Sequence, residues 1–416
     1  MTKMRRLVTA GLVGAVSAVW SAGSAAGQEI VEQYHSKDWT LNVHVRVAAW
    51  QQRHIRPDQL PAHDVWSFDQ TAVVFPVIQK SSTSELSDRG VKSVLTFDDR
   101  VIDDAFKGYL AGYHSGTRLG KWGIIKMTGR ELELKIQLPV TCSRVRFNEE
   151  AAARAIWPNQ WPPDAASSFE PQMFVDYASG SRPYDMKIID RMVKDWTKGD
   201  VKKVHPVVAA KVLAREVVGH VQQIAGIGVG FNRLGELEGV ALRGVPVIAS
   251  TRRGNEFEMV CLLASVYRRA GIPARTVIGW DVNEDEDEFL KRGKKENKFR
   301  AWVEFALYDP KSDGVVWVPV DIVEMWNDRN RNPFRDDYWN RPLDHFGNID
   351  DSDRVIPFAF QFHPPTTVRS YGSPGFWGWL MLPESPERAQ QAISFHAVST
   401  AQRAADQQNR SGYGGG

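Results

Sequence analysis

The sequence predicts an α+β fold in which a small all-β domain precedes a domain of helices and strands. Residues 38–148 contain runs of alternating apolar and polar residues, which is the period of a strand with one solvent-facing side. Residues 185–270 have apolar residues at helical spacing, and residues 274–320 return to short runs typical of strands. The 416 residues are enough for two domains that each bury a core.

The N-terminus has the three parts of a secretory signal. A short basic segment is followed by an apolar run over residues 7–20 and then by small residues up to Gly27. The apolar run is shorter than the roughly 20 residues of a membrane-spanning helix, and an uncleaved anchor is the alternative. We therefore expect residues 1–27 to be a signal peptide, and the protein to be periplasmic or extracellular with no membrane span after cleavage.

The N-terminal domain, residues 28–148, is expected to be a small antiparallel sandwich or barrel. Its expected strands are Thr40–Val47, Ala72–Ile78, Val91–Phe97 and Glu131–Leu138. In the first of them Leu41, Val43 and Val45 share one face, which predicts that this face is buried. Residues 149–184, rich in Pro, Asp and Ser, are interpreted as a linker.

The second domain, residues 185–325, is expected to begin with helices and to continue with strands. The expected helices are Asp185–Thr197, Pro206–Ile224 and Glu256–Ala270, and the expected strands are Ala274–Trp280, Phe299–Leu307 and Val315–Val320. The third helix is apolar on nearly every side, so we expect it to be buried in the core.

The C-terminal part has little periodicity. Residues 326–383 are rich in Trp, Phe, Pro and Asp and are interpreted as an arm that wraps the domain. Residues 384–416 are expected to contain a short helix, Gln390–Ala405, and a disordered tail.

Charge does not select a nucleic-acid partner. The 52 Lys and Arg residues nearly balance the 50 Asp and Glu residues, and no basic run stands out. Two cysteines are present, Cys142 at the end of a strand region and Cys261 in the expected buried helix. Two separate buried thiols are the preferred interpretation, and a disulfide in an oxidising compartment is the alternative.

No metal or other cofactor is expected. Asp281 and the alternate residues that follow it resemble the start of a calcium loop, which needs glycine at its sixth position and glutamate at its twelfth. Glu286 and Arg292 occupy those positions, so the pattern fails. The ten histidines show no metal-binding spacing such as His-x-x-x-His.

Four motifs follow one another in the second domain. They are Arg253-Gly-Asn-Glu256 at a helix start, Gly271-Ile-Pro-Ala-Arg275 after that helix, Arg300-Ala-Trp-Val-Glu304 on a strand, and Trp317-Val-Pro-Val-Asp321 on the next strand. This order resembles the transglutaminase-like superfamily, relatives of papain-type thiol enzymes, over residues 185–325. The resemblance implies a core in which a helix packs on an antiparallel sheet.

The resemblance also implies where the catalytic triad would lie. In the family, a cysteine at the helix start is the nucleophile, a histidine on the strand is the base, and an aspartate orients that histidine. The matching positions here are Glu256, Arg300 and Asp321, so only the aspartate is retained. Arginine stays protonated and cannot act as a base. Cys261 lies five residues along the helix and faces away from Glu256, so it is not expected to replace the nucleophile.

The replacements preserve the charges of the family site. A thiolate and an imidazolium become a carboxylate and a guanidinium, which predicts a Glu256–Arg300–Asp321 salt-bridge cluster, with unrelated substitutions in a decayed site as the alternative. Trp280, Trp302 and Arg275 are possible groove residues. Core packing explains Trp280 equally well and is the preferred interpretation of Trp302, and Arg275 either braces the site or lies on an exposed strand face.

The leading functional hypothesis is an exported transglutaminase-like protein without catalytic activity that binds a peptide or protein or acts as a scaffold. The alternative is a peptide or isopeptide hydrolase that uses Glu256 as general base. A third hypothesis is a purely structural role. The identity of the partner and the oligomeric state remain open at this stage.

Overall fold

The computed structural model describes residues 29–49, 66–67, 72–87, 90–111, 116–123, 128–169, 185–224, 229–231, 237–240, 242–282, 299–331, 340–360, 378–380 and 389–399. The predicted signal peptide, the predicted tail after residue 399 and the acidic and basic run at residues 283–298 lie outside these ranges. Within them, no helix is both long and apolar enough to cross a bilayer.

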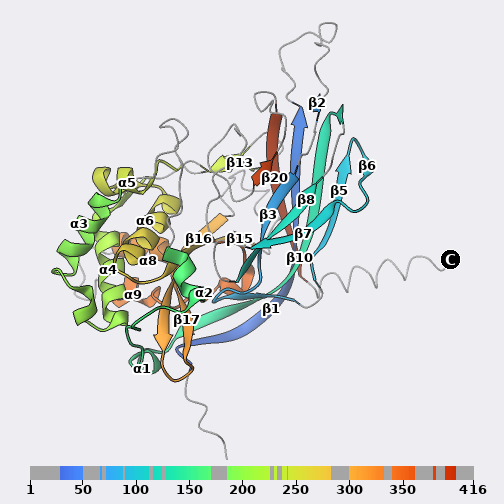
Figure 1. Ribbon diagram of the computed structural model, residues 1–416. Coiled ribbons are helices and arrows are strands. Elements are labelled where there is room, and N and C mark those ends of the chain that lie inside the picture. The colour runs from blue at the N-terminus through green and yellow to red at the C-terminus, as the bar shows by residue number, and fades with distance from the viewer. Residues whose placement is uncertain are drawn as a thin grey trace, which may run out of the picture.

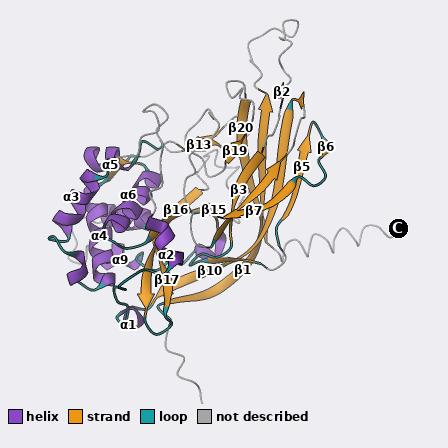
Figure 2. Cartoon of the chain, in the orientation of Figure 1, coloured by secondary structure: helices purple, strands orange, loops and turns teal. Residues whose placement is uncertain are grey.

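Long antiparallel strands form one side of the molecule (Figures 1 and 2). The larger sheet has the strand order β12-β13-β20-β1-β10-β5-β6, with β4 paired to β10. Its strands are β1 (Val31–Ala49), β4 (Ser84–Leu86), β5 (Lys92–Phe97), β6 (Arg100–Val101), β10 (Glu131–Phe147), β12 (Val229–Phe231), β13 (Leu237–Val240) and β20 (Ala389–Ser399). A second sheet, β19-β3-β8-β7, consists of β3 (Ala72–Ile78), β7 (Phe106–Ala111), β8 (Thr117–Gly123) and β19 (Gly378–Leu380). A short pair joins β2 (Trp66–Ser67) to β9 (Thr128–Gly129).

The alternation in β1 and β10 produces one buried face, as predicted. Leu41, Val43 and Val45 are buried, and they pair with Leu138, Ile136 and Leu134 of β10 in the same order. Because side chains of a strand alternate between faces, a shift of one residue would move all of them to the solvent side. Burial of each such side chain stabilises the fold by about 1.5–3 kcal/mol, which fixes the register.

The C-terminal segment differs from its prediction. Residues 389–399 form β20, which pairs antiparallel with β1 along its length, and the predicted helix over Gln390–Ala405 is therefore wrong. Its Ala and Gln residues favour helix. Ile393 and Phe395 are nevertheless buried, with Ser394 between them, and they lie opposite Val45 and Val43. The free edge of β1 and this period-two pattern outweigh the local propensity.

Helices and a four-stranded sheet form the other side of the molecule. The sheet order is β17-β16-β15-β18. Its strands are β15 (Ala274–Asp281), β16 (Phe299–Asp309), β17 (Gly314–Val320) and β18 (Val355–Ala359). The helices are α3 (Lys187–Trp196), α4 (Pro206–His220), α5 (Val245–Thr251), α6 (Glu256–Arg269), α8 (Ile322–Arg331) and α9 (Asn340–Asp344). The α+β class with a preceding β domain is confirmed.

Helix α6 is the centre of this second part. It packs against α3, α4, α5, α8 and the sheet strands β15 and β16, and most of its side chains are buried. An all-round apolar helix is stable only where neighbours cover every side. The predicted burial of this helix is therefore confirmed.

The segments between and after the predicted domains are more structured than expected. The predicted linker contains α1 (Glu149–Ala152), α2 (Pro163–Ala166) and a 3-10 turn over Ser167–Phe169. The predicted arm supplies α9, strand β18 and η5, the 3-10 turn over Ser352–Arg354. Helix α4 ends at His220, after which β11 (Gln222–Gln223) pairs with β14 (Arg253–Gly254) just before α6.

A buried ion pair of the second part lies where the two parts meet. Arg275 on β15 lies 2.6 Å from the Glu304 carboxylate on β16, and both side chains are almost completely buried. The backbone N–H and the hydroxyl of Ser82, from the β domain, donate to the same carboxylate at 2.9 and 2.6 Å. Glu304 thus accepts hydrogen bonds from both parts of the protein.

Candidate functional site

The start of α6 is fixed by a capping box. The Asn255 side chain accepts the N–H of Glu258, and the Glu258 carboxylate accepts the N–H of Asn255. Arg243 donates to Glu258 from its side chain at 2.7 and 3.1 Å. This arrangement places Glu256 at the first helical position, where the helix dipole favours a negative charge.

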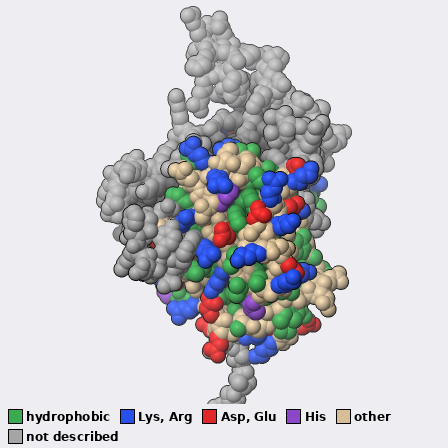
Figure 3. Space-filling view, turned by 90° about the vertical axis from the view of Figure 1, so that its left-hand side faces the viewer, with side chains coloured by type: hydrophobic (Ala, Val, Ile, Leu, Met, Phe, Trp, Pro, Cys, Tyr) green, Lys and Arg blue, Asp and Glu red, His purple; other side chains and the backbone are tan. Residues whose placement is uncertain are grey.

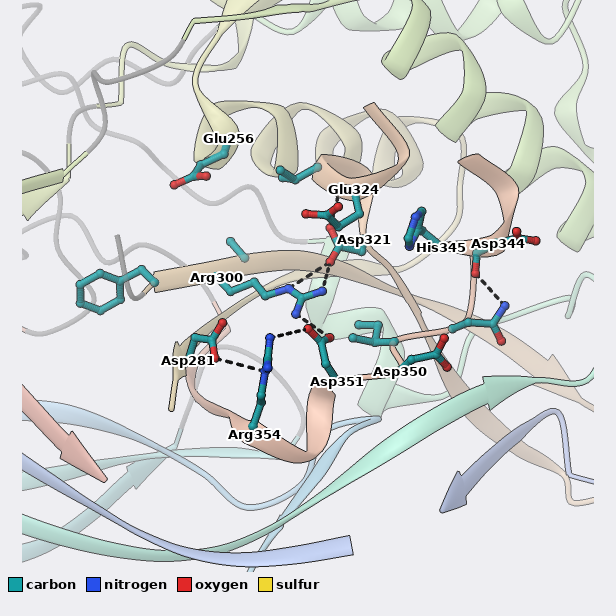
Figure 4. Close-up of a pocket in the computed structure, with 15 residues that line it drawn as sticks. Glu256, Asp281, Arg300, Asp321, Glu324, Asp344, His345, Asp350, Asp351 and Arg354 are labelled. Carbon is teal, nitrogen blue, oxygen red and sulfur yellow. Dashed lines mark hydrogen bonds and ion pairs between the residues drawn. The ribbon is translucent and has the colours of Figure 1, made fainter. Parts of the chain in front are cut away.

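Arg300 lies on the neighbouring strand β16 and forms two ion pairs. Its Nη2 lies 2.7 Å and its Nε 3.2 Å from Asp321 Oδ2, just after β17. Its Nη1 lies 2.6 Å from Asp351 Oδ1. Asp321 is buried at 2% side-chain exposure and Arg300 is 21% exposed, so this charge cluster is largely shielded from water (Figure 4).

Asp351 was not identified from the sequence. It belongs to the turn at residues 350–354, which comes from the segment predicted as an arm, and it also pairs with Arg354 at 3.2 Å. Arg354 in turn lies 3.6 Å from Asp281 at the end of β15. No motif marks Asp351, because its place beside Arg300 depends on how β18 joins the sheet.

The turn at residues 350–354 is also bound to the β domain, through the buried carboxylate of Asp353. Arg144 donates to it at 2.8 Å and Lys37 lies at 3.3 Å. Burial alone raises the pKa of Asp353, but the hydrogen bonds and charges of these two residues lower it below its usual value. The turn therefore connects the β domain to the charge cluster.

The electrostatics of the cluster keep Arg300 charged. Burial lowers the pKa of Arg300, but the charges of Asp321 and Asp351 raise it more, so its pKa lies above its usual value. A permanently protonated guanidinium can donate hydrogen bonds but cannot take up a proton. The position that resembles the family's base therefore cannot perform base catalysis.

Glu256 lines the same cavity as Arg300 and Asp321. In Figure 4 its carboxylate points away from the Arg300 guanidinium, while Asp321 and Asp351 point toward it. The three predicted residues thus meet at one site, and the ion pairs seen for Arg300 are with Asp321 and Asp351. The carboxylate that completes the cluster on Arg300 is Asp351.

The cavity has a volume of about 590 Å³ and is strongly acidic. Two arginines, Arg300 and Arg354, and one histidine, His345, are its basic residues. Its acidic residues are Glu256, Asp281, Asp321, Glu324, Asp344, Asp350 and Asp351. The charge of the described lining is therefore negative, in contrast to the mixed charges on the helix side of the surface in Figure 3.

The three possible groove residues lie outside the lining of this cavity. Arg275 is 2% exposed, pairs with Glu304 and lies against the ring of Phe360 at 3.7 Å. Trp302 is buried in the core at 1% exposure. Trp280 stacks on Phe395 of β20, with 5.3 Å between the ring centroids. Trp302 and Arg275 share the face of the sheet that carries Arg300, but they lie two to four residues further along the paired strands, where that face is buried.

Neither cysteine is available as a nucleophile. Cys142 and Cys261 are both buried free thiols, which agrees with the preferred interpretation from the sequence. Burial raises the pKa of Cys261 well above its usual value, against a smaller opposing effect of Arg268. A buried, protonated thiol is unreactive. Among the described residues no group of His, Cys, Asp and Glu has the geometry to hold a metal ion.

The fold and the site together define an α+β protein whose central helix begins at a charge cluster. Residues 240–322 match the family model of the transglutaminase-like superfamily. This match covers the first residue of α6, Arg300 and Asp321, so this region of the chain has a transglutaminase-like fold. Among curated proteins, none matches the chain.

Several solved structures resemble the chain at low identity. A protein of Cytophaga hutchinsonii, provisionally described as a cysteine protease, is 10% identical, with a TM-score of 0.42 over 88% of this chain and 100% of its own. The periplasmic domain of TgpA from Pseudomonas aeruginosa is 14% identical, with a TM-score of 0.29 over 67% of this chain and 88% of its own. Red sea bream transglutaminase is 14% identical, with a TM-score of 0.23 over 60% of this chain and 48% of its own. None of these similarities bears on activity.

Proposed function

We propose that the chain is an exported transglutaminase-like protein without thiol chemistry, and that its cavity binds a segment of a peptide or protein. The observation that carries the proposal is the engagement of Arg300, at the position of the base, by Asp321 and Asp351. Two carboxylates within hydrogen-bonding distance hold the guanidinium in place. The proton transfer that the family's histidine performs has no counterpart here.

The nucleophile position supports the same conclusion. A thiolate at a helix start attacks carbonyl carbon because it is both charged and polarisable, and Glu256 supplies only a carboxylate. Removing a triad nucleophile alone lowers turnover by about a million-fold in a serine protease. The replacement of both partners leaves binding as the function that the cavity retains.

The cavity has features typical of a binding site. Its volume of about 590 Å³ falls within the range of small-ligand pockets, and its lining differs from theirs in being mainly charged. Its side chains come from the start of α6, from β15 and β16, from Asp321 and the start of α8, and from the segment between α9 and the turn at residues 350–354. A site built from several packed elements keeps its shape in the absence of ligand.

Export is supported by the N-terminal 27 residues, with their basic, apolar and small-residue segments. Buried free thiols are compatible with an oxidising compartment, because a thiol without access to an oxidant or a partner does not form a disulfide. Mass spectrometry of the secreted or periplasmic fraction would test export, and a mature chain that retains residues 1–27 would contradict it.

Turnover assays test the absence of thiol chemistry. The purified protein, a cysteine-alkylated sample and the Glu256→Gln variant are incubated with peptide, isopeptide and glutamine-donor substrates beside an active transglutaminase. We expect no turnover above background in any of the three samples. Turnover that is lost on alkylation would refute the proposal, and turnover that survives alkylation but is lost in Glu256→Gln would indicate a carboxylate-based hydrolase instead.

A further inference from the structure

The charges of the cavity are not balanced within the described part of the chain. Seven carboxylates line it, against two arginines. Arg300 is shared by Asp321 and Asp351, and Arg354 by Asp281 and Asp351. Both cations are thus already engaged by three of the seven acids.

Three of the remaining carboxylates have no ion-pair partner among the described residues: Glu324, Asp344 and Asp350. Glu324 accepts a hydrogen bond from the Asn327 side chain, and Asp350 accepts one from the Tyr34 hydroxyl at 2.9 Å. These donors are neutral, and the charge of Arg144 also acts on Asp350 from the β domain. In Figure 4, Asp344 and Asp350 lie on the opposite side of Arg300 from Glu256, which spreads negative charge along the cavity.

Apolar side chains lie between these acids. Phe299, Val323 and Ile349 line the same cavity. Lysine and arginine side chains combine a charged end with an aliphatic stem, and such stems bind along apolar surface while the charged end reaches a polar group. An acidic rim with apolar walls is complementary to that combination.

We infer that the ligand of this cavity is a cationic peptide segment, with lysine or arginine side chains directed at Glu324, Asp344 and Asp350. This inference rests on the proposed binding function and names the chemical class of its ligand. The cavity supplies the carboxylates and the peptide supplies the cations. Concave sites lined by one sign of charge also raise the association rate of ligands of opposite charge.

The test is a binding titration with a dye-labelled hexalysine peptide. The matched controls are the same peptide with every side-chain amine acetylated, and hexaglutamate of equal length. The cavity variant is Asp344→Asn/Asp350→Asn. The control variant, Asp103→Asn/Asp195→Asn, removes two exposed charges that do not line the cavity. Melting temperatures establish that all the proteins are folded.

We expect hexalysine to bind. The cavity variant should weaken binding about tenfold and acetylation about thirtyfold, because the variant removes two ion pairs, acetylation removes three, and each exposed ion pair contributes about threefold. The control variant should bind like the wild type, and salt should weaken binding. Equal affinity for the acetylated peptide, an equal loss in the control variant, or no binding of hexalysine would overturn the inference. Binding that does not depend on the charge of the peptide would overturn this inference and leave the proposed binding function intact. Turnover that is lost on cysteine alkylation would refute the proposed function, and the charge preference of the cavity could still be measured.

Discussion

The buried Arg275–Glu304 pair, which lies where the two parts meet, allows the sharpest test of how buried charges stabilise this protein. Arg275 is 2% exposed and Glu304 is fully buried, and their closest charged atoms lie 2.6 Å apart. The Arg275 guanidinium lies between the rings of Trp317 and Phe360, at 4.1 and 3.7 Å. Burial lowers the pKa of Arg275, and the charge of Glu304 opposes that effect. Each charge therefore depends on the other.

The substitution Arg275→Met keeps most of the side-chain volume and removes the charge. It leaves the Glu304 carboxylate buried without the charge of Arg275. The N–H and the hydroxyl of Ser82 still donate hydrogen bonds to that carboxylate. Removing one partner of a buried pair costs about 3–5 kcal/mol, because the other charge stays without compensation. Glu304→Leu should cost a similar amount. The double variant should cost much less than the sum, since no buried charge then remains.

Urea unfolding followed by tryptophan fluorescence measures these changes, because the chain contains 15 tryptophans. A matched control is the exposed pair Lys80–Glu85, with side-chain exposures of 68% and 65% in the same region as Ser82. Lys80→Ala should change the free energy of unfolding by less than about 1 kcal/mol. Small and additive effects of Arg275→Met and Glu304→Leu would refute the reasoning that this pair is energetically coupled.

Three further predictions concern the site and the thiols. Arg300→Met should lower the free energy of unfolding by about 2–4 kcal/mol, because it leaves the buried Asp321 without its cation, and an unchanged urea midpoint would contradict this. Asp353→Asn should destabilise the protein near neutral pH. Since its basic neighbours hold the pKa of Asp353 below the unfolded value of about 3.9, this difference from the wild type should shrink as the pH falls below about 4, and a difference that persists in acid would exclude the ion pairs as its source. A thiol-specific dye should label neither Cys142 nor Cys261 in the native protein and both after denaturation, and rapid native labelling would show that a thiol is accessible.

Local sequence signals located the elements that carry the site. The motif Arg253-Gly-Asn-Glu256 and the apolar run after it predicted a helix over Glu256–Ala270, and α6 is found at Glu256–Arg269. The motif at Arg300 and the aspartate at Asp321 lie on adjacent strands, so their meeting follows from sheet pairing. These features act over a few residues, which is why they could be predicted.

Other features could not be predicted because they join segments far apart in the chain. Asp351 is 51 residues from Arg300, and no periodicity indicates that they meet. The β20 segment has the composition of a helix, and pairing with β1 decides that it is a strand. The burial of Arg275 and Trp302 follows from the packing of the β domain, because Ser82 donates to the Glu304 partner of Arg275 and Trp302 clusters with Ile78 and Val145.

The sequence by itself determined the α+β class and the burial of α6, since each depends on a local pattern of residues. The tertiary structure decided which carboxylates surround Arg300. It also decided that β18 joins the four-stranded sheet and that β20 joins the larger sheet. It also decided the excess of negative charge in the cavity. These properties depend on long-range packing, in which a small difference between competing arrangements fixes where each charged side chain lies.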